Sequence, residues 1–253
     1  GEGRAFVGIG AYAPSDDGNR LAYTIDTTGY REYVLYVKDL RTGAVSAPMA
    51  ERVDGVAWST DGSTLMYAQE DSSTKRTYLA LRQKLGGKPE VVFEEKDDLY
   101  DLGVSRTRSK AYFLLTSESA TTTEVRYVPA NQPSAPARVI APRIDEQEYE
   151  VDHAGDRFLI RTNDKGRTFR LVSAPVKTPG RDNWVELIPN RPETMLEQVD
   201  AFSDHMVTTE REDGLVRFRV RSLDGKNPEE ITFPEPTYSV FAMQNYQFST
   251  PEF

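Results

Sequence analysis

Two aspartate–histidine pairs are the residues in this chain whose types could serve general base chemistry. Asp152–His153 and Asp204–His205 contain the only two histidines of the sequence. A carboxylate can orient an imidazole, but a catalytic triad needs a third group as well, and neighbouring residues on a strand point to opposite faces. We therefore expect both pairs to lie at turns between strands and to serve the fold rather than catalysis.

The sequence motifs of well-known catalytic and binding sites are missing as well. The sequence has no G-x-S-x-G, no H-E-x-x-H, no P-loop and no glycine-rich dinucleotide turn. It contains no cysteine, so it offers neither a disulfide nor a thiolate metal site. We therefore expect no catalytic residue, no metal site and no cofactor in this chain.

The charge of the chain favours basic partners. A net charge of −9 and a pI near 5.0 argue against nucleic acid. The most concentrated acidic stretch is Glu94-Glu-Lys-Asp-Asp98, which would either recruit basic peptides or simply keep a surface loop solvated. No apolar run approaches the roughly twenty residues of a membrane span, and residues 1–4 do not resemble a signal peptide.

A repeated β unit must position all of these residues. One seven-residue motif recurs at a period of roughly 44 to 48 residues, which is inside the range of propeller blades. Its copies are Arg20–Asp26, Thr64–Glu70, Lys110–Thr116, Arg157–Asn163 and His205–Arg211. Each copy is preceded by one predicted strand and followed by two. The predicted third strands are Glu32–Leu40, Thr77–Leu85, Thr123–Asn131, Phe169–Lys177 and Val216–Asp224. The predicted fourth strands are Ala44–Met49, Glu90–Glu94, Ala137–Ala141, Val185–Pro189 and Glu229–Phe233.

The sequence thus predicts an all-β fold, a β-propeller of four-stranded antiparallel blades. Ser15–Gly18 and Ser59–Gly62 place the S-x-D-G pattern of a tight turn at the same point of two units. The five expected complete blades cover residues 6–50, 53–95, 99–142, 148–190 and 196–235, and a sixth starts at 238–253. Propellers close with about four to eight blades. We therefore expect a partial propeller, residues 1–253, from a longer protein, with possible self-association through its open outer sheets.

Several stretches, in order and at the right spacing, resemble the propeller of the oligopeptidase B enzymes, which belong to the prolyl oligopeptidase family of serine peptidases. They are Thr27–Tyr33, Val37–Leu40, Phe93–Asp98, Ala120–Arg126, Glu148–His153, Trp184–Pro189 and Phe233–Pro236. The resemblance implies a parent with a seven-bladed propeller over an α/β-hydrolase domain, which carries the catalytic Ser, Asp and His. It also implies cleavage of short peptides after Arg or Lys. None of the catalytic residues can be placed on this chain, so the hydrolase domain is absent from it.

The role that remains is gating, in which a propeller over an active site admits short peptides and excludes folded proteins. The candidates for interdomain salt bridges or for steering basic peptides are Arg31, Glu94, Glu95, Asp97 and Asp98. Two other functions stay open: a freestanding scaffold that binds a protein partner, and, more weakly, a hydrolase with a central metal. The cellular location is open, although the resemblance and the absence of cysteine favour the cytoplasm.

Overall fold

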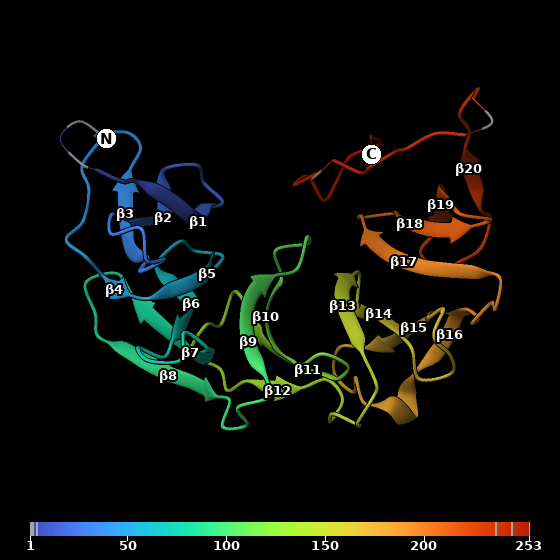
Figure 1. Ribbon diagram of the computed structural model, residues 1–253, viewed down its shortest axis with the longest axis horizontal. Coiled ribbons are helices and arrows are strands. Elements are labelled where there is room, and N and C mark those ends of the chain that lie inside the picture. The colour runs from blue at the N-terminus through green and yellow to red at the C-terminus, as the bar shows by residue number, and fades with distance from the viewer. Residues whose placement is uncertain (1–2, 4, 236, 244, 253) are drawn as a thin grey trace. The chain divides into compact units, whose positions relative to one another are not determined.

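The computed structural model describes residues 3, 5–235, 237–243 and 245–252, and in these residues it contains five four-stranded antiparallel sheets. In every sheet the strands follow each other in chain order, which makes each sheet a meander (Figure 1). Val, Tyr, Leu, Ile and Thr dominate these segments, and such side chains fit a pleated, half-buried surface. The all-β fold expected from the repeats is therefore confirmed.

The strands have the following bounds. Sheet 1 consists of β1 (Gly8–Pro14), β2 (Arg20–Asp26), β3 (Val34–Asp39) and β4 (Ala50–Glu51). Sheet 2 consists of β5 (Val53–Trp58), β6 (Thr64–Glu70), β7 (Thr77–Lys84) and β8 (Pro89–Glu94). Sheet 3 consists of β9 (Asp101–Arg106), β10 (Tyr112–Glu118), β11 (Thr123–Pro129) and β12 (Arg138–Val139). Sheet 4 consists of β13 (Tyr149–Ala154), β14 (Arg157–Thr162), β15 (Arg170–Pro175) and β16 (Val185–Ile188), with the 3-10 helix η1 (Arg181–Asn183) before β16. Sheet 5 consists of β17 (Thr194–Ala201), β18 (His205–Glu212), β19 (Leu215–Ser222) and β20 (Glu229–Ile231).

The chain forms two compact units. Unit 1 contains the described residues up to Arg106 together with Lys110–Ala120 and Arg126–Val139. Unit 2 contains Thr107–Ser109, Thr121–Val125 and the described residues from Ile140 onward.

Within each unit the sheets pack on one another through apolar faces. In unit 1 one core joins sheets 1 and 2 around Trp58 and Tyr67, and a second joins sheets 2 and 3 around Phe113. In unit 2 a core around Leu171 and Met206 joins sheets 4 and 5. Face-to-face packing of successive meanders is the arrangement of propeller blades.

The tandem S-x-D-G turns form as the sequence predicts. The Asp17 carboxylate accepts the Asn19 N–H at 3.0 Å, and Gly18 has a φ of 68°. The Asp61 carboxylate accepts the Ser63 N–H at 3.0 Å in the same way. Each turn thus closes a β-hairpin with its own side chain.

Three local expectations differ from the structure. The short strand β4 begins at Ala50, although Ala44–Met49 was the expected strand, because Pro48 has no N–H to donate to a ladder there. His153 lies within β13 rather than at a turn. Residues 238–243, expected to open a sixth blade, form no strand in the structure, and the rest of that segment includes Gln244 and Phe253, which lie outside the described residues.

Candidate functional site

The loops at one end of sheets 1 and 2 hold the residues expected to meet a partner. In an antiparallel meander, the connection between second and third strands and the connection to the next sheet lie at the same end. In unit 1 these are residues 27–33, 71–76 and 95–100, which we call the docking loops. Lys75 Nζ lies 3.4 Å from Glu32 Oε1 and so joins the second loop to the first.

Arg31 is held by its backbone and leaves its side chain exposed. Asp26 is buried at the end of β2, and its carboxylate accepts the N–H groups of Thr28 and Arg31 at 2.8 Å each. Burial alone would raise the pKa of Asp26, but these bonds outweigh it and lower the pKa. Arg31 takes a positive φ of 58°, a conformation that the Asp26 bond supports. The loop therefore presents the Arg31 guanidinium to solvent from a fixed backbone.

Arg76 organises the acidic stretch. Its guanidinium donates to the carbonyl oxygens of Tyr100 at 2.8 Å and of Glu95 at 3.2 Å. It also pairs with Asp98 at 3.1 Å, although the Asp98 side chain is 93% exposed. One partly buried cation, Arg76, thus anchors the backbone of the loop, and the Asp98 carboxylate stays accessible.

The expected acidic residues divide by exposure. Glu95 is 2% exposed and its carboxylate accepts the Asp97 N–H at 3.1 Å, so it supports the loop from inside. Glu94, at the end of β8, and Asp97 are exposed, as is Asp98. The docking loops, together with Glu94 beside them, therefore offer three accessible carboxylates and the accessible Arg31.

One further acidic residue that the sequence did not single out, Glu70, lies beside the docking loops. Glu70 ends β6, and its N–H donates to the carbonyl of Arg52 at 2.9 Å. Burial raises the pKa of Glu70, although Lys75, Arg31 and Arg52 oppose this rise. The sequence alone does not reveal that Glu70 lies near Lys75, Arg31 and Arg52. Their proximity depends on how the loops around Glu70 fold.

The aspartate–histidine pairs do not form a triad. The Asp152 carboxylate accepts the N–H groups of Arg108 at 3.3 Å, His153 at 2.8 Å and Ala201 at 3.2 Å, so it binds backbone rather than the imidazole. His153 is buried and its Nδ1 lies 2.8 Å from Ser109 Oγ, a contact that sequence reasoning missed. Burial lowers the pKa of His153. Because Asp152 bonds backbone N–H groups, the Asp152–His153 pair does not have the arrangement of a catalytic triad.

The His205 imidazole, unlike that of His153, contacts the carboxylate of the aspartate before it, although neighbouring side chains were expected to point apart. Asp204 precedes β18 and lies outside the strand, so its carboxylate reaches His205 Nδ1 at 2.8 Å. The rule that neighbouring side chains point apart applies only when both residues are in the strand. The Asp204 side chain is 81% exposed, and the imidazole stacks on Phe202 with ring centroids 4.6 Å apart.

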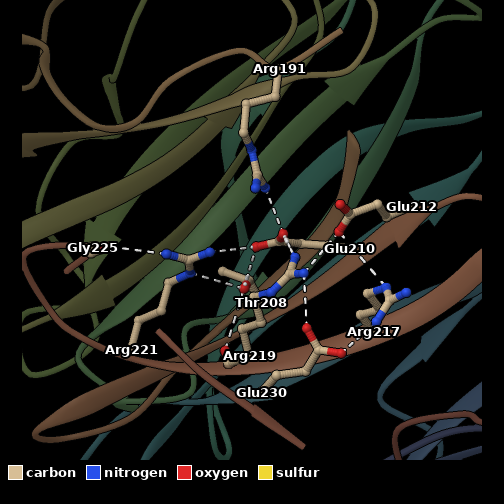
Figure 2. A network of polar contacts seen from close by, with 9 residues as sticks. All are labelled: Arg191, Thr208, Glu210, Glu212, Arg217, Arg219, Arg221, Gly225 and Glu230. Atoms are coloured by element: carbon tan, nitrogen blue, oxygen red, sulfur yellow. Dashed lines mark hydrogen bonds and ion pairs between the residues drawn. The ribbon is translucent and has the colours of Figure 1, made fainter. Parts of the chain in front are cut away.

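Unit 2 contains a dense ionic network on one face of sheet 5 (Figure 2). Glu210 is completely buried and accepts from Arg191 at 2.5 Å, from Arg221 at 2.8 Å, from Thr208 Oγ at 2.8 Å and from Arg219. Both oxygens of this carboxylate are occupied, which suits a structural role and not proton transfer. The alternation of arginine with apolar residues in Arg217–Arg221 is the sequence signal for this face, whereas residues 208–212 are polar throughout.

Comparisons with known proteins define the class of this domain. The N-terminal β-propeller domain model of prolyl oligopeptidase matches residues 1–253, and the chain belongs to this family. Dipeptidyl aminopeptidase BI of Pseudoxanthomonas mexicana is 32% identical over 99% of the chain and 35% of its own length. Protease 2 of Moraxella lacunata is 28% identical over 98% of the chain and 36% of its own length.

Solved structures agree on the fold. Oligopeptidase B from Leishmania major superposes with a TM-score of 0.83 and 22% identity, over 93% of this chain and 35% of that one. The expected resemblance to the oligopeptidase B propeller is thus confirmed. The chain spans about a third of the length of these relatives. Within the described residues, no helix has the length and apolar character needed to cross a membrane, and no group of His, Cys, Asp and Glu suits a metal ion.

Proposed function

We propose that this chain is the non-catalytic, substrate-selecting propeller domain of a serine oligopeptidase that cleaves short peptides after Arg or Lys. The observation that carries the proposal is the match of the family's propeller domain to residues 1–253, in a chain with no G-x-S-x-G motif. The partner of the propeller is then a C-terminal α/β-hydrolase domain. A propeller beside such an active site admits extended peptides and excludes folded proteins by size.

The docking loops give this role a physical basis. Their backbones are fixed by buried groups, Asp26 in the first loop and Arg76 with Glu95 in the third. Their charges point outward on Arg31, Glu94, Asp97 and Asp98. We propose that these four side chains make interdomain salt bridges or steer basic peptides, and that Glu95 holds the loop. Preorganised backbones reduce the entropy cost of ordering on docking.

An activity assay tests the domain assignment. The chain and the full-length protein that carries it would be compared with a fluorogenic peptide ending in Arg and a fluorophosphonate probe for an active serine. We expect cleavage and labelling only in the full-length protein. Labelling of the 253-residue chain itself would contradict the non-catalytic assignment.

A matched pair of variants tests the steering role. Glu94 and Glu90 lie on the same strand, β8, and both side chains are exposed. In the full-length protein, we expect Glu94→Gln together with Asp97→Asn and Asp98→Asn to reduce kcat/KM for a basic peptide about twofold to tenfold at low salt, because each charge adds to the field. Glu90→Gln, which removes a charge away from the docking loops, should leave the rate unchanged. An unaltered rate and salt dependence in the triple variant would exclude steering.

Two other functions have specific support. The similarity to Dipeptidyl aminopeptidase BI favours a parent that acts at peptide amino termini, and this parent would lose activity when the substrate amino group is acetylated. A freestanding scaffold that binds a protein partner is the remaining alternative, since many propellers have no chemistry. It would be favoured if the full-length protein neither cleaved peptides nor reacted with the probe.

A further inference from the structure

An ion cluster in unit 1 joins three turns that lie far apart in the sequence. Arg106 ends β9, and its guanidinium binds the Asp16 carboxylate through both nitrogens, at 3.1 Å and 2.9 Å. The same guanidinium donates to Thr60 Oγ1 at 3.3 Å. Lys110 Nζ lies 3.1 Å from Asp16 Oδ1, the same oxygen that accepts from Arg106 Nη1. Asp16 lies in the β1–β2 turn, Thr60 in the β5–β6 turn, and Arg106 and Lys110 border the β9–β10 turn.

The cluster differs from an ordinary surface ion pair in geometry and burial. The Arg106 side chain is 11% exposed and that of Asp16 is 25% exposed. The third guanidinium nitrogen, Nε, donates to the Lys110 carbonyl at 2.7 Å, so all three nitrogens of Arg106 have acceptors. Bidentate pairing at low exposure is stronger and more directional than a solvated pair.

The contact also connects sheets that share no core. The two apolar cores of unit 1 join sheet 1 to sheet 2 and sheet 2 to sheet 3. The first strand β5 lies against both β1 and β9, and it approaches β9 so closely that a Cβ on Gly55 would lie 2.8 Å from the Val104 carbonyl oxygen. Packing thus fixes each neighbouring pair of first strands, and the Asp16–Arg106 and Asp16–Lys110 contacts link the turns of the first sheet and the third directly.

We infer that Asp16, Arg106 and Lys110 form a clasp that limits how far the first strands of sheets 1 and 3 separate, and that its opening widens the path of a peptide along these strands. The first strands of propeller blades border the central channel. The clasp can open at modest cost because it lies at strand ends, where water replaces the lost contacts, whereas the apolar cores stay intact. The claim that opening widens a peptide path rests on the proposed gating function. The claim that the three residues form a clasp does not.

Hydrogen exchange in the full-length protein that carries this chain tests the clasp directly. With Arg106→Gln, we expect exchange to rise about tenfold at the amides of both the β1–β2 and the β9–β10 turns, because the two ends are released together. The charge-swapped triple variant Asp16→Arg/Arg106→Asp/Lys110→Glu, which reverses every charge of the cluster, should restore protection in both turns. Arg41→Gln, which breaks an exposed pair with Asp39 inside a single turn of sheet 1, is the control and should leave both turns unchanged.

The outcomes separate a clasp from a local contact. Faster exchange confined to the β9–β10 turn, or a charge swap without restored protection, would overturn the inference. If Arg106→Gln does not fold, Arg106→Lys keeps the charge and loses the fork, and the same paired increase is expected with a smaller amplitude.

Kinetics of the full-length protein test the path of the peptide. In Arg106→Gln, we expect kcat/KM for a long basic peptide to rise several-fold relative to a short one, with the short peptide unaffected. An unchanged ratio, despite paired exchange in the two turns, would refute the widening step. Failure of the proposed function would look different, because the unaltered full-length protein would then show no preference for short peptides at all.

Discussion

Glu210→Gln removes the charge at the centre of the ionic network in sheet 5 and leaves the shape of the side chain nearly unchanged. In the native protein this buried carboxylate accepts from three arginines, Arg191, Arg219 and Arg221, and from Thr208 (Figure 2). Glutamine has one acceptor oxygen where glutamate has two, and its NH₂ group would face a guanidinium. The variant therefore removes the carboxylate that Arg191 and the largely buried Arg221 contact, whereas Arg219 keeps its pairs with Glu212 and Glu230.

The expected loss of stability follows from the pKa of Glu210. Burial would raise this pKa, but the bonds from Arg191, Thr208 and Arg221 outweigh burial and lower it from 4.5 to about 2. That difference corresponds to about 3 kcal/mol of preference for the charged form. Breaking a buried ion pair by removing one partner costs about 3–5 kcal/mol. We therefore expect the free energy of unfolding to fall by about 3 kcal/mol at neutral pH.

Urea unfolding of wild type and variant at several pH values provides the assay. Because the folded pKa is lowered, this stabilisation is present above 4.5 and is lost as the pH falls toward about 2. The gap between Glu210→Gln and wild type should accordingly close in that window. Glu150→Gln is the matched control, since Glu150 pairs with Arg161 at 2.6 Å but is 63% exposed, and its loss should stay below about 1 kcal/mol. Equal losses in the two variants, or a gap independent of pH, would refute the argument.

Three further predictions concern packing, titration and association. Trp58→Phe should cost about 1–3 kcal/mol in urea unfolding, because Trp58 is 1% exposed and its indole N–H donates to the Ala13 carbonyl at 2.9 Å. Burial raises the pKa of Asp152 from 3.8 to about 6, so the native state holds this proton more tightly than the unfolded chain does. Its contribution to stability should then increase as the pH falls from about 6 to 3.8, and Asp152→Asn should remove that increase. The chain should self-associate in light scattering, and Ile9→Ser with Tyr12→Ser should reduce the association, because these side chains are 70% and 64% exposed on sheet 1.

Local information was sufficient to predict the repeat and its turns. Asp17 and Asp61 bond the backbone two residues later, so the four residues of each turn contain everything that determines its shape. The third strand of the second unit begins at Thr77, as predicted, because the short apolar run Tyr78–Leu81 marks a strand packed on both faces. Strand boundaries failed where one residue changes the pairing, as at Pro48.

The contacts between turns could not be predicted in the same way. Asp16 and Arg106 are 90 residues apart, and the repeat gives no indication of which turn residues meet across sheets. The acidic stretch shows a second limit of prediction from sequence. Glu95 and Asp98 are both acidic residues of one short stretch, but Glu95 is only 2% exposed, whereas the Asp98 side chain is 93% exposed. Which of these two side chains is buried depends on Arg76. Its guanidinium donates to backbone carbonyls of this loop and so fixes the loop conformation.

The distribution of charge suggests how a stacked β domain could combine rigidity with controlled opening. Apolar cores fill the space between neighbouring sheets of each unit, and such close packing resists partial separation. The Asp16–Arg106 pair instead lies at the ends of strands, where separation exchanges a protein contact for water at modest cost. Glu210 shows the opposite placement, because a carboxylate buried within a sheet face among arginines cannot be released without a large penalty. Sheets of this kind should therefore move as intact bodies, with any opening confined to polar contacts between their turns.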